Sequence, residues 1–433
     1  MKPLRSYRSN ATGVYLFLEF ASSAAFSMMF VVMSLYEATT AGLSPLQLVL
    51  VGTTVEASVF LFEVPTGVVA DAYSRRLSIV IGYVIMGAGF LVEGLFPAFL
   101  PIVLAQILWG LGYTFTSGAT QAWITDEIGE EPANRLFLRA AQVGLFASLI
   151  GMGAAALVGG RDAALPIRAG GIVVMLIGAV LALIMPETGF KAMPWEDRNT
   201  WQHMWHTFQE GLKAVRSRPR LMSIVGVELV FGLYSEGFDR LWVKHLLDRF
   251  ELPIFFGSNQ VAFFAVLRMA GTLLAMLALR MVEKRVSTGS PLAIGRAMLL
   301  VTGTISVAMV GFAWSPYLAA SLVLYLIIYV VRNTGFPLQT AWINQKLEPK
   351  VRATIHSMFG QVDAVGQVAG GPGVGLIARF FSVAAAITTS ALLLSPALFL
   401  IGQANRLSLP GEESQAAPEA AESPGGSQPA REG

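Results

Sequence analysis

The sequence predicts an all-α membrane protein with twelve transmembrane helices in two pseudo-symmetric bundles of six. Three observations predict it. The 433 residues are 54% hydrophobic and only 13% charged, whereas a soluble protein carries roughly a quarter charged residues. The apolar residues gather in runs of about 20, the length that spans a bilayer as a helix. A repeated sequence pattern also relates the two halves of the chain.

Twelve apolar segments follow one another along the chain, most of them joined by short connections. They cover residues 12–37, 45–70, 77–96, 99–126, 136–158, 165–186, 221–246, 257–281, 291–312, 316–344, 353–377 and 380–402. The first segment follows a basic start but is longer than the apolar core of a signal peptide and lacks a small-residue cleavage site. We therefore expect it to be a retained helix.

The repeat lies where the fourth and tenth segments end. QAWITDEIGEEPANR (Gln121 to Arg135) is matched by TAWINQKLEPKVR (Thr340 to Arg352). A weaker match sets Glu19 against Glu228. Such repeats are typical of transporters built from two parallel halves. We expect bundles over 1–186 and 221–406, a cytoplasmic amphipathic linker over 187–220, and a disordered cytoplasmic tail over 407–433, which has too little apolar content to fold.

Lysine and arginine collect on one side of the predicted membrane. That side holds Lys2, Arg5, Arg8, Arg75, Arg76, Arg135, Arg139, Lys191, Arg198, Lys213, Arg216, Arg218, Arg220, Lys284, Arg285, Lys346, Lys350, Arg352 and Arg406, and the opposite loops hold far fewer. Because cytoplasmic loops carry the excess of basic residues, both termini are expected in the cytoplasm. We place the protein in the inner membrane of a bacterium as a multi-pass monomer.

Several function classes are disfavoured by what the sequence lacks. It has no cysteine, and no Walker loop, nucleophile elbow or zinc motif is found. His203 and His206 have no companion ligands, so no metal site is expected. The basic residues lie in loops between spans and form no dense patch, so nucleic acid is not an expected partner. We expect neither an enzyme nor a bound cofactor.

A short polar hairpin follows the second segment and reads GVVADAYSRR. Its Gly67, Asp71, Arg75 and Arg76 match the loop signature G-x-x-x-D-x-x-G-R-[RK], so the chain resembles the major facilitator superfamily. Ser74 stands where that family usually has glycine. The resemblance implies a conformational latch, with the aspartate facing the cytoplasmic start of the eleventh span, where a helix N-terminus favours an anion. A plain topological anchor is the alternative interpretation.

Two longer stretches, FLFEVPTGVVADAYSRRLS and LAQILWGLGYTFTSGATQAWITDEIG, resemble the drug:proton antiporter-3 branch of that superfamily. This branch includes exporters of tetracycline and macrolides. Two motifs of the family are not matched. Gln106 stands where the R-x-x-x-G motif of the fourth span has its arginine, and the fifth span lacks the Gly-Pro pair of antiporters. Both departures weaken the usual assignment of proton antiport.

Ionisable side chains within the predicted spans are the candidate site. Each costs about 2.5–3.5 kcal/mol at the centre of a span and so needs a partner, a wet cavity or a function. The set comprises Glu19, Glu56, Glu63, Glu228, Arg268, Arg332 and Asp363. We expect Glu56 and Asp363 to carry protons in a cavity between the halves, followed by Glu19. Arg268 or Arg332, beside such a carboxylate, would favour its charged form and so set proton release.

Static ion pairs between helices are the alternative for these charges. For Glu19 and Glu228 both interpretations are open, and for Glu63, next to the boundary loop, a structural role is favoured. Glu236 and Arg240 are four residues apart and are expected to pair on one helix.

The function predicted is secondary active transport by alternating access. Aromatic and methionine side chains are frequent in the spans, which suits a hydrophobic or amphipathic, drug-like substrate. Proton-coupled efflux is the main hypothesis, with the small molecule, protons and the lipid bilayer as partners. The alternatives are an importer or facilitator of a small metabolite, and a non-transporting sensor on the same fold.

Overall fold

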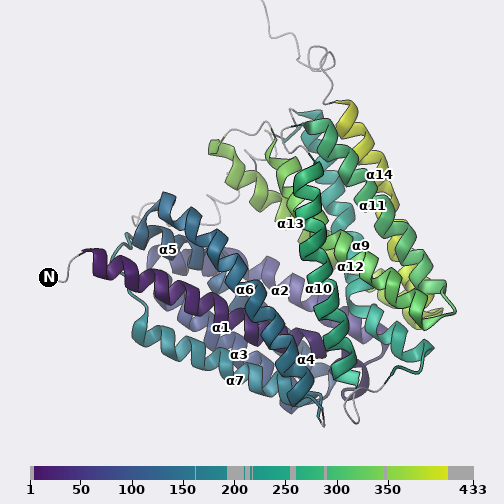
Figure 1. Cartoon of the computed structure of the whole chain (residues 1–433), viewed down its shortest axis with the longest axis horizontal. Coiled ribbons are helices and arrows are strands. Elements are labelled where there is room, and N and C mark those ends of the chain that lie inside the picture. The colour runs from purple at the N-terminus through teal and green to yellow at the C-terminus, as the bar shows by residue number, and fades with distance from the viewer. Residues whose placement is uncertain are drawn as a thin grey trace, which may run out of the picture.

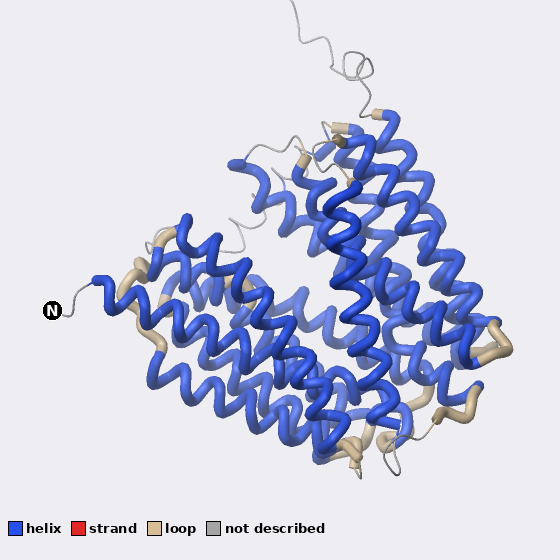
Figure 2. The backbone as a smooth tube through the Cα atoms, in the orientation of Figure 1, coloured by secondary structure: helices blue, strands red, loops and turns tan. Residues whose placement is uncertain are grey.

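The computed structural model describes residues 4–160, 162–192, 209, 215–216, 218–253, 260–286, 290–345 and 349–407. Regular secondary structure within these ranges is entirely α-helical (Figure 2). Most of the predicted linker and the predicted tail from residue 408 onward lie outside the described residues.

The described helices form two groups. The first bundle consists of α1 (Leu4–Thr39), α2 (Pro45–Ala72), α3 (Arg75–Leu95), α4 (Phe99–Thr116), α5 (Ala119–Ile128), α6 (Glu130–Val158) and α7 (Ala164–Ile184). The second consists of α9 (Pro219–Arg249), α10 (Gln260–Arg285), α11 (Pro291–Trp314), α12 (Leu318–Asn344), α13 (Pro349–Phe380) and α14 (Val383–Arg406). Serine side chains cap the N-termini of several helices. Ser44 forms a capping box with Gln47 at α2, and Ser74 caps α3.

The fourth predicted span, 99–126, is divided into α4 and α5. Gly118, between them, has φ +70°, a left-handed conformation that glycine adopts without the steric cost of a Cβ atom. Gly129, with φ +91°, separates α5 from α6 in the same way. We count α4 and α5 together as one crossing, so the twelve predicted spans correspond to the helices observed.

Eleven of these crossings are long and apolar enough to span a membrane by themselves, among the described residues. The exception is α13, which has 32 residues but a Gly-rich, polar sequence. It packs against α2, α9 and α14. A Cβ atom on Gly366 or Gly370 would touch the backbone of α9. Because α13 packs against three neighbouring helices, much of its surface is in contact with protein, and its most apolar stretch has a lower mean hydropathy than those of the other spans.

The two bundles meet at one end of the molecule and diverge at the other (Figure 1). We call the diverging end, where α1 begins and α14 ends, the terminal face, and the opposite end the far face. Near the far face α2 packs directly on α13: a Cβ atom on Gly371 would meet Thr53 Oγ1, and one on Gly375 would lie 2.9 Å from Leu46 Cδ1. Helices α6 and α10 form a further contact between the bundles.

Candidate functional site

A cavity of about 750 Å³ lies in the second bundle. Its lining comes from α9, α10, α11, α12 and α13 and includes both aromatic and charged side chains. Four of the intramembrane charges identified from the sequence line it: Glu228, Arg268, Arg332 and Asp363. The cavity therefore brings together these four charged side chains, each from a different helix of this bundle.

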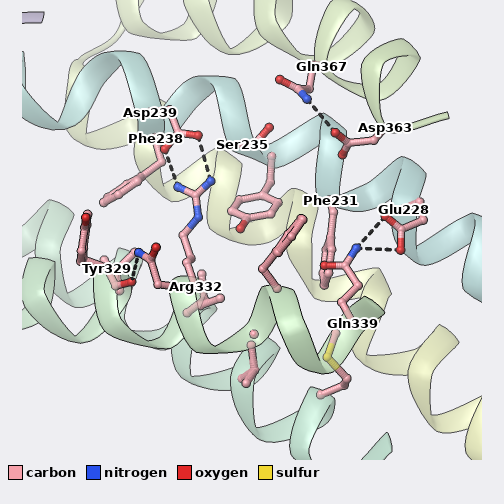
Figure 3. A pocket seen from close by; sticks show the side chains of 18 of the residues that line it. Glu228, Phe231, Ser235, Phe238, Asp239, Tyr329, Arg332, Gln339, Asp363 and Gln367 are labelled. Atoms are coloured by element: carbon pink, nitrogen blue, oxygen red, sulfur yellow. Dashed lines mark hydrogen bonds and ion pairs between the residues drawn. The ribbon is translucent and has the colours of Figure 1, made fainter. Parts of the chain in front are cut away.

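Three carboxylates of the cavity have defined donors (Figure 3). Arg332 forms a two-pronged ion pair with Asp239, in which Nη2 lies 2.8 Å from Oδ2. Gln339 Nε2 donates to both oxygens of Glu228, at 2.7 and 2.6 Å. The contacts of Asp239 and Glu228 both join α9 to α12, so polar interactions hold these two helices together at the cavity wall.

Asp363 accepts a hydrogen bond from Gln367 Nε2 at 2.7 Å, one turn further along α13. The sequence suggested that Arg268 or Arg332 could act on one of the intramembrane carboxylates, and the charge of Arg332 does act on Asp363. The direct hydrogen-bond donor of Asp363 is a neutral amide, and the two-pronged partner of Arg332 is Asp239. That partner was not among the predicted site residues, because the pairing depends on how α9 and α12 face each other.

Arg268 on α10 lies among aromatic rings. Its guanidinium carbon is 5.9 Å from the centroid of Trp242 and 5.7 Å from that of Tyr329. Trp242 in turn stacks on Tyr325, with centroids 4.2 Å apart. Such contacts are worth about 0.5–2 kcal/mol and hold the guanidinium without neutralising it.

Glu56 projects from α2 of the first bundle toward the charges of the second. The charges that act on it are those of Glu236, Arg240, Asp363 and Asp239, on α9 and α13. Within the described ranges its carboxyl group makes no ion pair or hydrogen bond. The structure therefore places Glu56 at the boundary between the bundles, in the same electrostatic environment as Asp363.

Glu19 lies elsewhere, inside the first bundle. It accepts a hydrogen bond from Ser23 Oγ at 3.2 Å, and its Oε1 lies 2.6 Å from the position a Cβ atom would take on Gly144 of α6. Glu63 joins the bundles, because Gln361 Nε2 on α13 donates to its Oε2 at 2.6 Å. The predicted pair of Glu236 and Arg240 is confirmed, at 3.5 Å.

The polar hairpin is bound to its own bundle. Arg75 pairs with Asp126 of α5 at 2.7 Å and lies 3.7 Å from Asp71, whose side chain is 49% exposed. Ser74 Oγ and the backbone N–H of Arg76 both donate to Glu187, just beyond α7. Ser74 thus caps α3 and holds Glu187, which accounts for a hydroxyl residue where the family signature has glycine.

Gly67 faces open space, with nothing within 4 Å of its Cβ position. The first side chains of α13 lie outside the described residues, so a contact between Asp71 and that helix start stays a prediction.

A buried carboxyl cluster near the far face was not predicted. Glu37 and Glu93 are both 0% exposed and lie within hydrogen-bonding reach of each other. Gln106 Nε2 donates to Glu93 at 2.7 Å, and Arg240 is among the nearest charges. Glu37 and Glu93 stand near the ends of predicted spans, where sequence alone does not separate buried charges from interfacial ones. The one available signal was Gln106, in place of the arginine of the family motif.

Arg240, the neighbour of this cluster, also belongs to the contact between α2 and α9. A Cβ atom on Gly52 of α2 would collide with the Glu236 carboxylate and the Arg240 guanidinium. The far-face contact between the bundles is therefore both close-packed and charged.

Comparison with known proteins places these features in a family. The sequence profile of the Major Facilitator Superfamily matches residues 15–371. A Bacillus subtilis protein described as the uncharacterized MFS-type transporter YxaM is 22% identical over 357 residues, which are 81% of this chain and 85% of the relative.

Two solved structures are similar in fold. The nucleoside transporter NupG has a TM-score of 0.70 at 14% identity, covering 92% of this chain and 99% of that one. A bacterial homologue of the human lysosomal transporter Spinster, in an inward-facing and unoccupied conformation, has a TM-score of 0.69 at 16% identity, covering 97% and 100%. At these identities the likeness concerns the fold alone.

Proposed function

Because the chain belongs to the Major Facilitator Superfamily, we propose that it is a secondary active transporter that exports a hydrophobic or amphipathic small molecule in exchange for protons. The resemblance of its second and fourth spans to the drug:proton antiporter-3 branch favours efflux of a drug-like compound, as in exporters of tetracycline. The positive-inside rule favours a cytoplasmic terminal face, and we place the protein in a bacterial inner membrane.

The observation that supports proton coupling is the hydrogen bonding of carboxylates to glutamine amides. Glu228 and Asp363 face the cavity, and their hydrogen-bond donors are Gln339 and Gln367. An amide donates to a carboxylate and, after rotation, accepts from a carboxylic acid. A glutamine partner therefore suits both protonation states, whereas an arginine would favour the charged one. Glu56, across the bundle boundary, is the third candidate proton carrier.

Alternating access would follow from rocking of the two bundles about their contact. In the arrangement observed, the terminal face is the diverging one and the far face is packed. Proton release or uptake at the boundary would change the charge between α2 and α13 and so favour one arrangement. We assign the hairpin residues Gly67, Asp71, Arg75 and Arg76 the latch role on the terminal face, and expect a monomer to suffice.

Flux measurements in inverted membrane vesicles test this function. The probe is tetracycline, and the expected result is accumulation that collapses when a protonophore removes the proton gradient. Glu56→Gln and Asp363→Asn should each lower this accumulation at least tenfold. Glu131→Gln is the matched control, because the Glu131 side chain is 84% exposed. Accumulation that persists with the protonophore would refute proton exchange.

An importer or facilitator of a small metabolite is the second candidate. The nucleoside transporter in the comparison has the same fold, and the cavity carries five charged side chains, more than an apolar substrate needs. Uptake into whole cells without efflux from inverted vesicles would favour this function. A non-transporting sensor would show binding but no flux in either preparation.

A further inference from the structure

We propose that the cavity of the second bundle recognises an organic anion, whose acidic group pairs with Arg268 and whose flat apolar part lies among the aromatic side chains. The proposal rests on the proposed transport of an amphipathic small molecule and names its substrate class. Arg268 lines the cavity and stands on α10, and no carboxylate forms an ion pair with it within the described part of the chain.

At the end of the cavity that contains Arg268, positively charged side chains outnumber negatively charged ones. Arg268 and Arg332 both face it, and the nearby carboxylate is that of Asp239. Both oxygens of Asp239 are engaged by the guanidinium fork of Arg332. A guanidinium within the membrane needs a counter-charge, since an unpaired charge there is strongly unfavourable. An anionic ligand would supply the counter-charge that the protein does not.

The surroundings of Arg268 hold it in a fixed orientation. Trp242 and Tyr329 each lie within 6 Å of the guanidinium carbon, and the Tyr325 hydroxyl lies close by. Aromatic faces contact a guanidinium without competing for all five of its N–H donors. The remaining donors form the planar fork that matches a carboxylate, which accepts two parallel hydrogen bonds.

The opposite end of the cavity has the reverse sign. Glu228 lies there with its partner Gln339, and it precedes Asp239 by eleven residues on α9. At 1.5 Å per residue, this separation is about 16 Å along the helix. An anion would be repelled from the carboxylate end and attracted to the arginine end, so the cavity would bind it in one orientation.

The remaining lining suits an apolar ring system. Phe231, Phe238, Phe336 and Met298 line the cavity between its charged ends. Its volume of about 750 Å³ lies within the range of roughly 300–1,000 Å³ that is typical of pockets for drug-sized ligands. A neutral apolar compound would fill this space but leave the guanidinium without a counter-charge.

Equilibrium dialysis on the purified full-length protein in lipid nanodiscs tests the proposal. The probes are radiolabelled 2-naphthoate and its neutral analogue 2-naphthamide, which share a ring system and differ in charge. We expect the protein to bind 2-naphthoate at least tenfold more tightly than 2-naphthamide. Arg268→Gln should reduce this ratio to about one. Arg268→Lys should keep part of it, because lysine retains the charge but not the planar fork.

Arg280→Gln is the matched control. Arg280 lies on the same helix and is exposed, so the same charge is removed outside the cavity, and the binding ratio should not change. Equal binding of both probes by the unaltered protein would overturn the proposal, as would an unchanged ratio in Arg268→Gln. The binding measurement uses no proton gradient. A negative result would therefore contradict the anion proposal without contradicting proton-coupled efflux.

Discussion

Glutamine amides are the recurring partners of carboxylates within the membrane region. Gln106, Gln339, Gln361 and Gln367 donate to Glu93, Glu228, Glu63 and Asp363, respectively. An amide satisfies a buried carboxyl group without fixing its charge. The same kind of amide-to-carboxylate hydrogen bond therefore recurs in the cavity, at the bundle boundary and in the far-face cluster.

The buried carboxyl cluster allows a residue-scale prediction. Both oxygens of Glu37 lack a hydrogen-bond donor among the described residues, and two carboxyl groups this close need a hydrogen between them. In Glu37→Gln the new amide supplies that donor to Glu93. We expect this variant to raise the free energy of unfolding by about 1 kcal/mol, measured by thermal unfolding in detergent.

Glu37→Ala is the comparison. It removes the same charge but leaves a void in a fully buried site, and so should lower stability. If Glu37→Gln lowered the unfolding midpoint as much as Glu37→Ala, the carboxyl group itself would be the stabilising element, through its neighbour Arg240.

Sequence patterns located the intramembrane charges but not their partners. A charge inside an apolar run is visible in the sequence, and Glu228, Arg268, Arg332 and Asp363 were found in this way. Their partners depend on the packing of two helices and on side-chain direction, so Asp239 and the glutamine donors were not identified. Glu37 and Glu93 were not predicted to be buried, because the sequence does not show whether a charged residue at the end of an apolar run faces the protein interior or the membrane surface.

At the scale of elements, α13 differs from the other spans. Glycines on two of its faces allow close contact with different bundles: Gly366 and Gly370 pack on α9, whereas Gly371 and Gly375 pack on α2. The glycine-rich character was visible in the sequence, but the division of these glycines between two neighbouring helices was not. Helix α13 is thus bound to its own bundle on one side and to the far-face contact on the other.

Gly371→Leu should open the far face. A side chain at this position would collide with Thr53 of α2, and the collision is relieved when the bundles separate there. Gly373→Leu is the matched control, because nothing lies within 4 Å of its Cβ position and the gain in helix propensity is the same. The chain contains no cysteine, so spin labels can be placed without removing native thiols.

The measurement uses labels at Phe96→Cys and Phe381→Cys, which are 55% and 79% exposed at the far ends of the two bundles. Pulsed electron spin resonance should give a longer distance, by several ångströms, in Gly371→Leu than in Gly373→Leu. Equal distances in both variants would mean that α2 and α13 accommodate the leucine without moving apart.

At the scale of the whole molecule, the two bundles place different polar features inside the same fold. Every residue that lines the large cavity belongs to the second bundle, whereas the first bundle contributes Glu56, the carboxyl cluster and the polar hairpin. The sequence repeat predicted two similar halves, and the family match supports that architecture. It did not predict this asymmetry, because a repeat preserves helix packing while the pocket side chains diverge.

Rocking of the bundles predicts opposite changes at the two faces. Exposed positions Asn134 and Gln403 lie near the terminal ends of α6 and α14, so labels at Asn134→Cys and Gln403→Cys report the terminal-face distance. If the bundles move as rigid bodies about their shared contact, Gly371→Leu should shorten this distance while it lengthens the far-face one. The shortening should also bring the hairpin, now held by Asp126 and Glu187, toward the second bundle. A far-face opening with no terminal-face closure would show that the bundles separate instead of rocking, and alternating access by this motion would be excluded.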